Sequence, residues 1–305
     1  MKRFKNKPAG IISTAELKTA KGKTVYWLMF SLLIVICIAS LLPTVWVLLM
    51  GFKGTQEIYS GITFFPKDMS FAHIKERIVE TVTVMKFGKT LLNTVVLAFG
   101  SVVLELTSCG LGGYVISRLK PRGAKGLFMA IVWTMMLPAQ IRIVPLFISY
   151  LSFPFIADIP GEVSLINTYW PIWIGAMANC FNVILFKNHF DSISTHIVEA
   201  AKIDGCGNGR IFFDIMVPLS KPIMLYVTIM TIKATWSNFF TGYLIWNDEN
   251  VRTLPVQIYM MRNNPDIKLN SYMLALTLSS LPMFILFAVF NKQIVTGVNI
   301  GGVKG

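Results

Sequence analysis

The sequence contains few charged residues. Asp, Glu, Lys and Arg make up 14% of its 305 residues, whereas about 25% is typical of soluble proteins. Hydrophobic residues, by contrast, make up 54%. A soluble fold of this length could not bury so much apolar surface, but a lipid bilayer can accommodate it. The composition therefore predicts an integral membrane protein.

Residues suited to metal or redox chemistry are also scarce. The chain has four cysteines and three histidines. No two cysteines form a CxxC pair, and the histidines do not cluster with them. Zinc sites usually have such closely spaced ligands, and Cys37, Cys109 and Cys180 lie in apolar segments, where a disulfide framework is not expected. We therefore expect no metal site and no cofactor.

Catalytic motifs are missing as well. A P-loop needs Gly-x-x-x-x-Gly-Lys-Ser/Thr to cradle phosphates. The segments Gly22–Thr24 and Gly88–Thr90 resemble its end, but Leu17 and Thr83 replace the first glycine. There is also no nucleophile elbow, HExxH motif or paired-carboxylate arrangement. The sequence predicts no catalytic residues, so we expect a protein that is not an enzyme.

Long apolar segments dominate the chain, and they predict an all-α membrane protein with six transmembrane helices. The first segment is too long for the apolar core of a signal peptide, so we interpret it as a retained helix. The predicted spans are Val25–Met50, Leu91–Ile116, Leu127–Leu151, Tyr169–Phe186, Ile223–Trp246 and Tyr272–Phe290.

The distribution of charge predicts the orientation. If the N-terminus is cytoplasmic, the inner segments hold 17 basic and five acidic residues, and the outer segments hold nine of each. This is the asymmetry of the positive-inside rule. The net charge of +13 is thus a topology signal rather than a sign of nucleic-acid binding. We expect cytoplasmic tails at 1–24 and 293–305, a transmembrane domain at 25–292 and a long inner loop at 187–221.

This inner loop has the pattern of two short helices at the membrane surface. Asp191 or Ser192 can cap the first helix, and Gly205 suits the left-handed turn that ends it. Asn208 can cap the second helix, and Pro218 can end it. The first helix is predicted to group four small or apolar residues on one face, namely Ile193, Ile197, Ala200 and Ala201. Physical reasoning alone leaves two interpretations open, a docking helix for another protein or an amphipathic connector resting on lipid headgroups.

The loop also resembles a known signature. It contains Glu199-Ala200-Ala201, then Gly205, Ile215, Val217 and Pro218. This pattern is similar to the cytoplasmic loop of permease subunits of bacterial ABC importers, with valine in place of the usual leucine. The resemblance implies the permease fold and a set of residues that contact a cytoplasmic ATPase. These residues are Glu199, Ala200, Ala201, Asp204, Gly205 and Pro218.

Other segments extend the resemblance. Asn93-Thr94, Gly113–Arg118 and Trp236–Phe240 are similar to family motifs in the membrane helices. The C-terminal Gly301–Gly305 resembles the tail of the smaller of the two maltose-transporter-type permeases. The resemblance therefore implies a subunit that carries a sugar or oligosaccharide across the cytoplasmic membrane.

The resemblance also implies partners: a second related permease, two cytoplasmic ATPases that hydrolyse ATP, and an extracytoplasmic sugar-binding protein. Membrane lipid surrounds the assembly, and no nucleic acid is expected. A stand-alone secondary transporter or channel for a polar solute is the alternative. It would explain the apolar helices but not the loop signature.

Two charged residues fall deep within predicted spans. Glu105 and Lys233 lie about 20 and 18 Å from the inner ends of their helices, at 1.5 Å per residue. Buried intramembrane charges are costly and are often functional. We therefore predict that the two side chains pair, within the bundle or across a polar cavity, and that Glu105, Lys233 and Asn238 lie on the substrate path. Asn179 and Asn182 are expected to bond a neighbouring helix rather than line the path.

Overall fold

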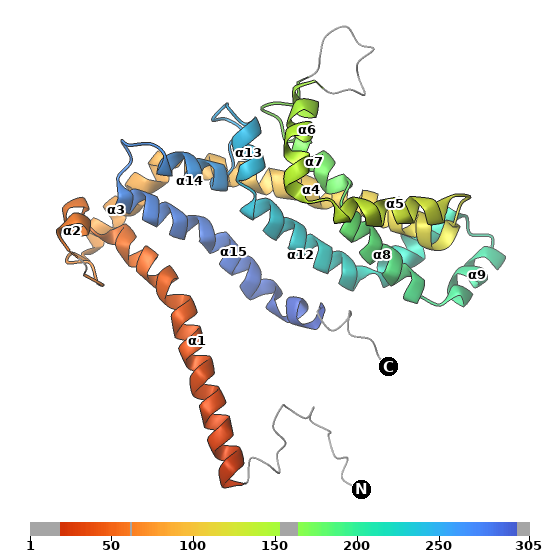
Figure 1. Cartoon of the computed structure of the whole chain (residues 1–305), viewed down its shortest axis with the longest axis horizontal. Coiled ribbons are helices and arrows are strands. Elements are labelled where there is room, and N and C mark those ends of the chain that lie inside the picture. Colours follow the sequence, from red (N-terminus) through yellow and green to blue (C-terminus); the bar gives the residue numbers. More distant parts are fainter. Residues whose placement is uncertain (1–18, 62, 153–163, 298–305) are drawn as a thin grey trace. The chain divides into compact units, whose positions relative to one another are not determined.

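The computed structural model describes residues 19–61, 63–152 and 164–297 (Figure 1). Every regular element in this described part is helical, which confirms the predicted all-α fold. The chain divides into two compact units. The first unit comprises residues 1–78 and 268–277, and the second comprises 79–267 and 278–305.

The first unit is built around the end of helix α1 (Ala20–Phe52). It also contains α2 (Thr55–Ser60), most of α3 (Phe71–Val84) and the start of α15 (Leu269–Gly297). Lys53 is buried immediately after α1, and its amino group donates hydrogen bonds to the hydroxyl and carbonyl oxygens of Thr63. Hydrogen bonds of this kind fasten the connection after the first long apolar helix.

The second unit holds most of the other helices, arranged around α4. Its central helices are α4 (Phe87–Tyr114), α7 (Trp170–Met177), α8 (Cys180–Ser192) and α12 (Lys221–Ser237). The remaining elements are the π-helical turn η2 (Val115–Leu119), α5 (Ala124–Met136), α6 (Ala139–Leu151), α9 (Thr195–Ile203), α10 (Asn208–Arg210), the π-helical turn η4 (Ile211–Met216), α11 (Val217–Leu219), α13 (Phe240–Ile245) and α14 (Leu254–Arg262).

Close contact between α4 and α8 depends on a glycine. An added Cβ at Gly113 would come within 2.7 Å of the Phe186 Cβ and 2.8 Å of the Lys187 backbone nitrogen. Small residues permit such close approach between membrane helices. The position therefore requires glycine because backbone atoms, not a flexible side chain, occupy the space.

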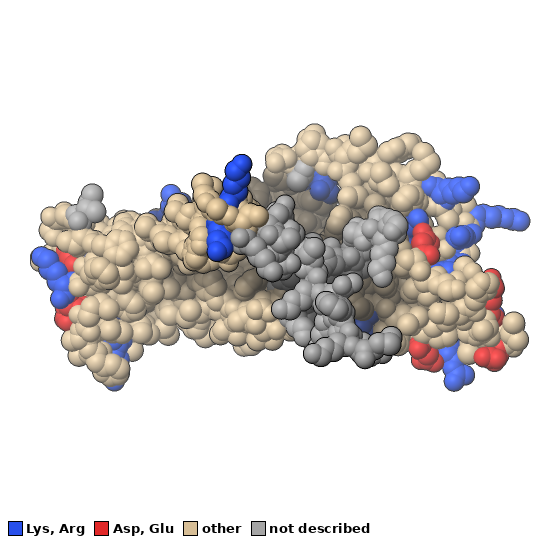
Figure 2. Space-filling model, turned by 90° about the horizontal axis from the view of Figure 1, so that it is seen from below, with Lys and Arg blue, Asp and Glu red and all other residues tan. Residues whose placement is uncertain are grey.

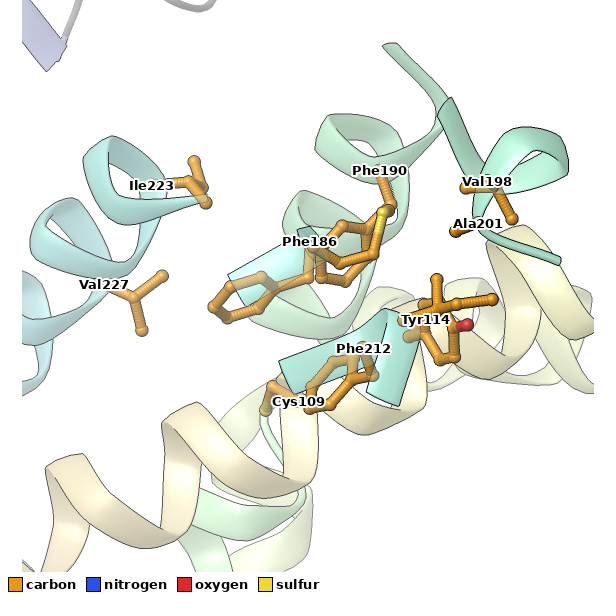
Figure 3. Close-up of a cluster of buried hydrophobic side chains, with 11 residues drawn as sticks. Cys109, Tyr114, Phe186, Phe190, Val198, Ala201, Phe212, Ile223 and Val227 are labelled. Carbon is orange, nitrogen blue, oxygen red and sulfur yellow. The ribbon is translucent and has the colours of Figure 1, made fainter. Parts of the chain in front are cut away.

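A buried apolar cluster joins the C-terminal ends of these helices (Figure 3). Aromatic rings from three elements meet in it: Tyr114 packs against Phe190 and Phe212 with centroid distances of 6.1 and 5.1 Å. Val198 and Ala201 of α9 point into the same cluster, as Figure 3 shows. The inner loop is therefore packed onto the membrane helices through its own side chains.

The six predicted spans are confirmed only in part. Three helices of the described chain are long and apolar enough to cross a membrane, and the number reaches five if each of two bent helix pairs forms one span. The predicted span Leu127–Leu151 is bent by 107° between α5 and α6. Pro138 lies at this break, and proline interrupts helical hydrogen bonding.

Two further predicted spans are interrupted. Tyr169–Phe186 is divided between α7 and α8, and Ile223–Trp246 is divided between α12 and α13. An asparagine lies at each division, Asn179 before α8 and Asn238 after α12. Apolar composition alone did not reveal these breaks. It does not show where a polar side chain can hydrogen-bond the free backbone groups at the end of a helix.

Candidate functional site

A buried carboxylate connects three helices of the second unit. Glu105 of α4 is 2% exposed. Its Oε1 accepts hydrogen bonds from the side-chain amides of Asn179 at 2.6 Å and Asn182 at 2.5 Å. Its Oε2 accepts a hydrogen bond from the Thr231 hydroxyl at 2.5 Å. A buried carboxylate is tolerated when such donors satisfy it, so α4, α8 and α12 share one polar cluster.

Asn179 has two functions in this cluster. Its side-chain oxygen accepts a hydrogen bond from the Asn182 backbone N–H at 3.3 Å and caps α8, while its side-chain nitrogen donates to Glu105. The break between α7 and α8 is thereby connected to the buried carboxylate. The prediction for Asn179 and Asn182 holds in part: both bond a neighbouring helix, because Glu105 belongs to α4, but both also line a cavity, which the prediction did not expect.

The polar cluster forms part of the wall of a cavity of about 440 Å³. This volume lies within the usual range of small-molecule sites. Ser101, Thr235 and Thr241 add hydroxyl groups to the wall, whereas Tyr150 and Tyr226 add aromatic rings. The cavity can therefore present both hydrogen-bonding groups and aromatic surfaces to a polar solute.

The structure separates the three residues predicted for the substrate path. Glu105 and Asn238 line the cavity, and Lys233 does not. The predicted pairing of Glu105 with Lys233 is wrong in this structure, since Lys233 is exposed and the carboxylate is occupied by Asn179, Asn182 and Thr231. Equal depth in the membrane did not fix which helix face each charge occupies.

A signal for the correct face was present in the sequence. Thr231, Thr235 and Asn238 follow one another at intervals of four and three residues, which places them on one face of a helix. Lys233 lies roughly 200° around the axis from Thr231, at about 100° per residue. The polar stripe of α12, rather than the charge of Lys233, identifies the surface that meets Glu105.

The predicted ATPase-contacting residues lie around α9, in a region where charged side chains gather. On the face shown in Figure 2, blue and red side chains concentrate at the right-hand end, around α9 and the start of α5. The short helix and its left-handed ending are confirmed, because α9 ends just before Gly205, whose φ is +78°. Gly205 meets no neighbouring atom that would exclude a Cβ, so backbone conformation favours glycine there.

The face of α9 differs from the predicted one. Ala201 and Val198 are buried in the chain's own core, whereas Ile197 and Ala200 are exposed. Ile193 precedes the helix. The grouping of Ile193, Ile197, Ala200 and Ala201 on one face is therefore wrong.

The outward side of α9 adds two residues, His196 and Ile203, to the predicted Glu199 and Ala200. Ile203 is 86% exposed, an unusual environment for isoleucine. His196 and Glu199 lie on the same side, with His196 Nδ1 3.6 Å from Glu199 Oε2. Together with Ala200, they form what we call the outward face of α9.

The predicted helix caps need a similar correction. Asp191 and Ser192 lie in the last turn of α8, and Ser194 precedes α9. Asn208 is the first residue of α10 rather than its cap. Pro218 lies inside the short helix α11, one residue before its end. Asp204 follows α9 directly and is exposed.

Asp191 instead fastens the last turn of α8 to the π-helical turn η2, which follows α4. Its carboxylate accepts hydrogen bonds from the Ser117 hydroxyl at 2.5 Å and from Lys187 Nζ at 2.8 Å. Partial burial raises the pKa of this carboxyl, but these two donors and nearby Lys120 outweigh it, so the pKa lies below its ordinary value. Arg118 adds to the connection by donating to the carbonyl oxygens of Phe190 and Ile193.

Comparison with known proteins identifies the family. Residues 109–300 match the family described as binding-protein-dependent transport system inner membrane component. The chain belongs to this family. It is therefore a transporter component rather than an enzyme, and a multi-pass protein of the cytoplasmic membrane, as predicted. The match begins within α4 and includes the cavity-lining helices α7, α8 and α12.

Several curated proteins are similar along nearly the whole chain. A probable ABC transporter permease of Bacillus subtilis, YurM, is 30% identical, with 93% of this chain and 89% of that protein covered. The diacetylchitobiose uptake permease NgcG of Streptomyces coelicolor is 28% identical, with 89% and 86% covered. The melibiose/raffinose/stachyose import permease MelC of Bacillus subtilis is 27% identical, with 95% and 100% covered.

A solved structure shares the fold. A chain of a bacterial ABC transporter that imports the acidic polysaccharide alginate superposes with a TM-score of 0.74 at 22% identity, covering 90% of this chain and 98% of that one. A second structure, of an alginate transporter in complex with a pentasaccharide-bound periplasmic protein, has a TM-score of 0.60 at 16% identity. The predicted permease fold agrees with these neighbours.

Proposed function

We propose that the chain is a permease subunit of an ATP-binding cassette importer and that it carries a sugar or oligosaccharide into the cell. The observation that carries this proposal is similarity over almost the full chain to permeases named for saccharide import, such as those for diacetylchitobiose and for melibiose, raffinose and stachyose. The predicted C-terminal tail signature, Gly301–Gly305, lies outside the described residues and adds only sequence support.

The cavity beside Glu105 is the proposed substrate path. Its hydroxyl, amide and carboxylate groups suit the hydroxyl-rich surface of a sugar, and Tyr150 and Tyr226 offer rings for its apolar faces. Both carboxylate oxygens of Glu105 accept hydrogen bonds from the protein's own side chains. We therefore assign it the role of holding α4, α8 and α12 in one arrangement, and we assign substrate contact to other wall residues such as the half-buried Asn238.

The outward face of α9 is the proposed contact with a cytoplasmic ATPase. Ala200 is exposed there beside Ile203, so a partner can approach the helix closely and cover an isoleucine. The inner side of α9 is anchored in the core through Val198 and Ala201. A helix held on one side and open on the other can transmit a partner's movement to α4, α8 and η4.

The complete assembly that we propose contains a second related permease, two ATPases that hydrolyse ATP, and an extracytoplasmic binding protein. The family description, which names binding-protein dependence, supports the last of these. We further propose six membrane crossings, with each bent or interrupted helix pair forming one crossing, and both chain ends in the cytoplasm.

Sugar uptake by intact cells tests the function. Cells that lack this chain should lose uptake of at least one radiolabelled saccharide from a panel of mono- and oligosaccharides, and the wild-type gene should restore it. In the same assay Ala200→Trp should lower uptake by about tenfold or more, because a bulky side chain blocks a close interface. Ala200→Ser, which keeps the residue small, is the matched control.

The ATPase contact has its own readout. Ala200→Trp should also reduce the amount of ATPase that copurifies with the chain, whereas Ala200→Ser should not. Unchanged uptake and unchanged copurification in Ala200→Trp would remove the docking role of α9. Normal saccharide uptake in cells without the chain would remove the transport function itself.

Thiol labelling tests the orientation. Single cysteines at positions 10, 122, 208 and 260 in a cysteine-free background should react differently with an impermeant reagent added to intact cells. The count of inner and outer charges predicts labelling at 260 alone. Labelling at 208 would place α9 outside the cell and contradict ATPase docking.

A further inference from the structure

A second cavity, of about 690 Å³, lies between the ends of α4, α5 and α8. We call it the basic cavity. Its lining combines basic and apolar residues from separate elements. Among them are Arg118 and Lys120 after α4, Lys125 and Phe128 of α5, and Lys187 of α8.

The basic side chains of the basic cavity differ in whether they already have a partner in the protein. Lys187 is paired with Asp191, the acidic residue of the lining, at 2.8 Å, and its Nζ lies 4.9 Å from the centre of the Phe128 ring. Arg118 donates to backbone carbonyls. Within the described chain, the side chains of Lys120 and Lys125 have neither a hydrogen bond nor a salt bridge. The charge of Lys120 also acts on nearby Asp191, but the amino groups of both lysines can still donate hydrogen bonds to an anion.

Backbone geometry brings these two lysines to the same cavity. Lys120 has a left-handed conformation, with φ +45° and ψ +53°, and ends the π-helical turn η2. Pro121 and Gly123 follow, and α5 starts at Ala124. The tight turn reverses the chain, so Lys120 and Lys125 line one cavity from both sides of the turn.

One wall of the basic cavity is apolar. Ile116, Ala124 and Phe128 contribute to it. Beyond Phe128, α5 has no buried residue within its length and exposes large apolar side chains such as Met129 and Trp133, which are 52% and 63% exposed. A ligand with an anionic end and an apolar tail matches this sequence of surfaces.

We propose that the basic cavity binds the phosphate headgroup of an anionic phospholipid, with Lys120 and Lys125 contacting the phosphate and an acyl chain lying along α5. Basic pockets between helices on the cytoplasmic side are suited to such headgroups. The proposal rests on the proposed function for one point only, that this end of α4 faces the cytoplasm.

The shared chemistry of the ligand is a phosphate anion, which could also come from free phosphate. The apolar wall and the exposed apolar surface of α5 favour the lipid, since free phosphate would leave both uncovered. A docking segment of an ATPase is a different class of partner. The outward face of α9 already offers an exposed surface for that partner, whereas Lys120 and Lys125 adjoin the apolar surface of α5.

Native mass spectrometry of the full-length chain in detergent tests the proposal. Phosphatidylglycerol and phosphatidylcholine are titrated separately, and phosphatidylglycerol is titrated again in excess inorganic phosphate. The wild type should bind phosphatidylglycerol about tenfold more tightly than phosphatidylcholine, and inorganic phosphate should not displace it. Lys120→Gln with Lys125→Gln should remove most of this preference, because each lysine near an anionic surface contributes roughly a fivefold gain.

Two variants control for charge and folding. Arg122→Gln removes the same charge from an exposed residue between the two lysines that does not line the cavity, and it should retain the preference. Lys120→Arg with Lys125→Arg keeps both charges and should also retain it. An equal loss in Arg122→Gln, or no preference in the wild type, would overturn the proposal.

Other outcomes would assign a different ligand to the basic cavity. Displacement of phosphatidylglycerol by inorganic phosphate would make it a free-phosphate site. Unchanged lipid binding together with loss of copurifying ATPase in the double glutamine variant would make it a protein interface. Saccharide uptake measured in the same variants keeps the transport function separate, because failure of lipid binding with normal uptake contradicts only the lipid site.

Discussion

Helices α1 and α4 look alike as apolar segments but are used in different ways. The apolar helix Ala20–Phe52 and the segment Phe87–Leu119 each have 33 residues, with mean hydropathies of 2.7 and 1.8. In the most apolar 18-residue stretch of the first helix, no part is buried inside the protein. In the corresponding stretch of the second segment, 33% is buried. Hydropathy therefore identified both as membrane helices but did not distinguish the exposed helix from the central one.

The polar residues of the two helices explain the difference. In α1, Ser31 and Ser40 donate to carbonyl oxygens of their own helix, at 2.9 and 2.8 Å. In α4, Glu105 is bonded from α8 and α12, and Ser108 donates to the Met177 carbonyl oxygen at 2.9 Å. A polar group in a membrane must be satisfied inside the protein. A helix that satisfies its polar groups internally can face lipid, and one that cannot must be surrounded by other helices.

The largest expected effect comes from placing a large side chain where α4 lies close to α8. Gly113→Leu should lower the free energy of unfolding by about 3 kcal/mol or more, because the new side chain meets the backbone of α8. Ala39→Leu in the exposed part of α1 should change stability little. Thermal unfolding of the purified chain in detergent measures both, and equal stability of the two variants would contradict the distinction between the helices.

A smaller effect is expected from removing the buried carboxylate. Glu105→Leu leaves the amides of Asn179 and Asn182 without their acceptor and should cost about 2 kcal/mol of stability. Lys233→Met, at an exposed position, should have a much smaller effect. Thermal unfolding of the singles and of the double variant checks this, and a coupling above about 0.5 kcal/mol between the two positions would restore the predicted pairing.

The smallest effect concerns the contact between Asp191 and the π-helical turn η2 after α4. The pKa of Asp191 is lowered in the folded chain by its donors Lys187 and Ser117, which exceed the opposing effect of burial. A lowered folded pKa stabilises the fold above the unfolded value of about 3.9, and this contribution is lost as the pH falls through the folded value. As the pH is lowered from neutral to below the unfolded value of about 3.9, unfolding temperatures should fall less steeply for Asp191→Asn than for the wild type, and parallel curves would contradict the assignment.

The inner loop illustrates how far the sequence could predict the site. Glycine at position 205 indicated a left-handed helix end, and the structure has φ +78° there. The face of α9 was predicted wrongly, because Ala200 and Ala201 are equally small and periodicity over a short helix does not show which side is covered. Burial of Val198 and Ala201 in the cluster that also contains Phe190 and Tyr114 determined the orientation.

The sequence by itself determined the membrane class, the helical fold and the family, because these depend on composition, apolar length and a local signature. The tertiary structure decided the partners of Glu105, the breaks beside Asn179 and Asn238, and the orientation of α9. The physical reason is that a buried polar group is satisfied by whichever donors the packing brings within hydrogen-bonding distance. Those donors come from helices up to 126 residues away along the chain, and the distance along one helix axis does not reveal which face meets them.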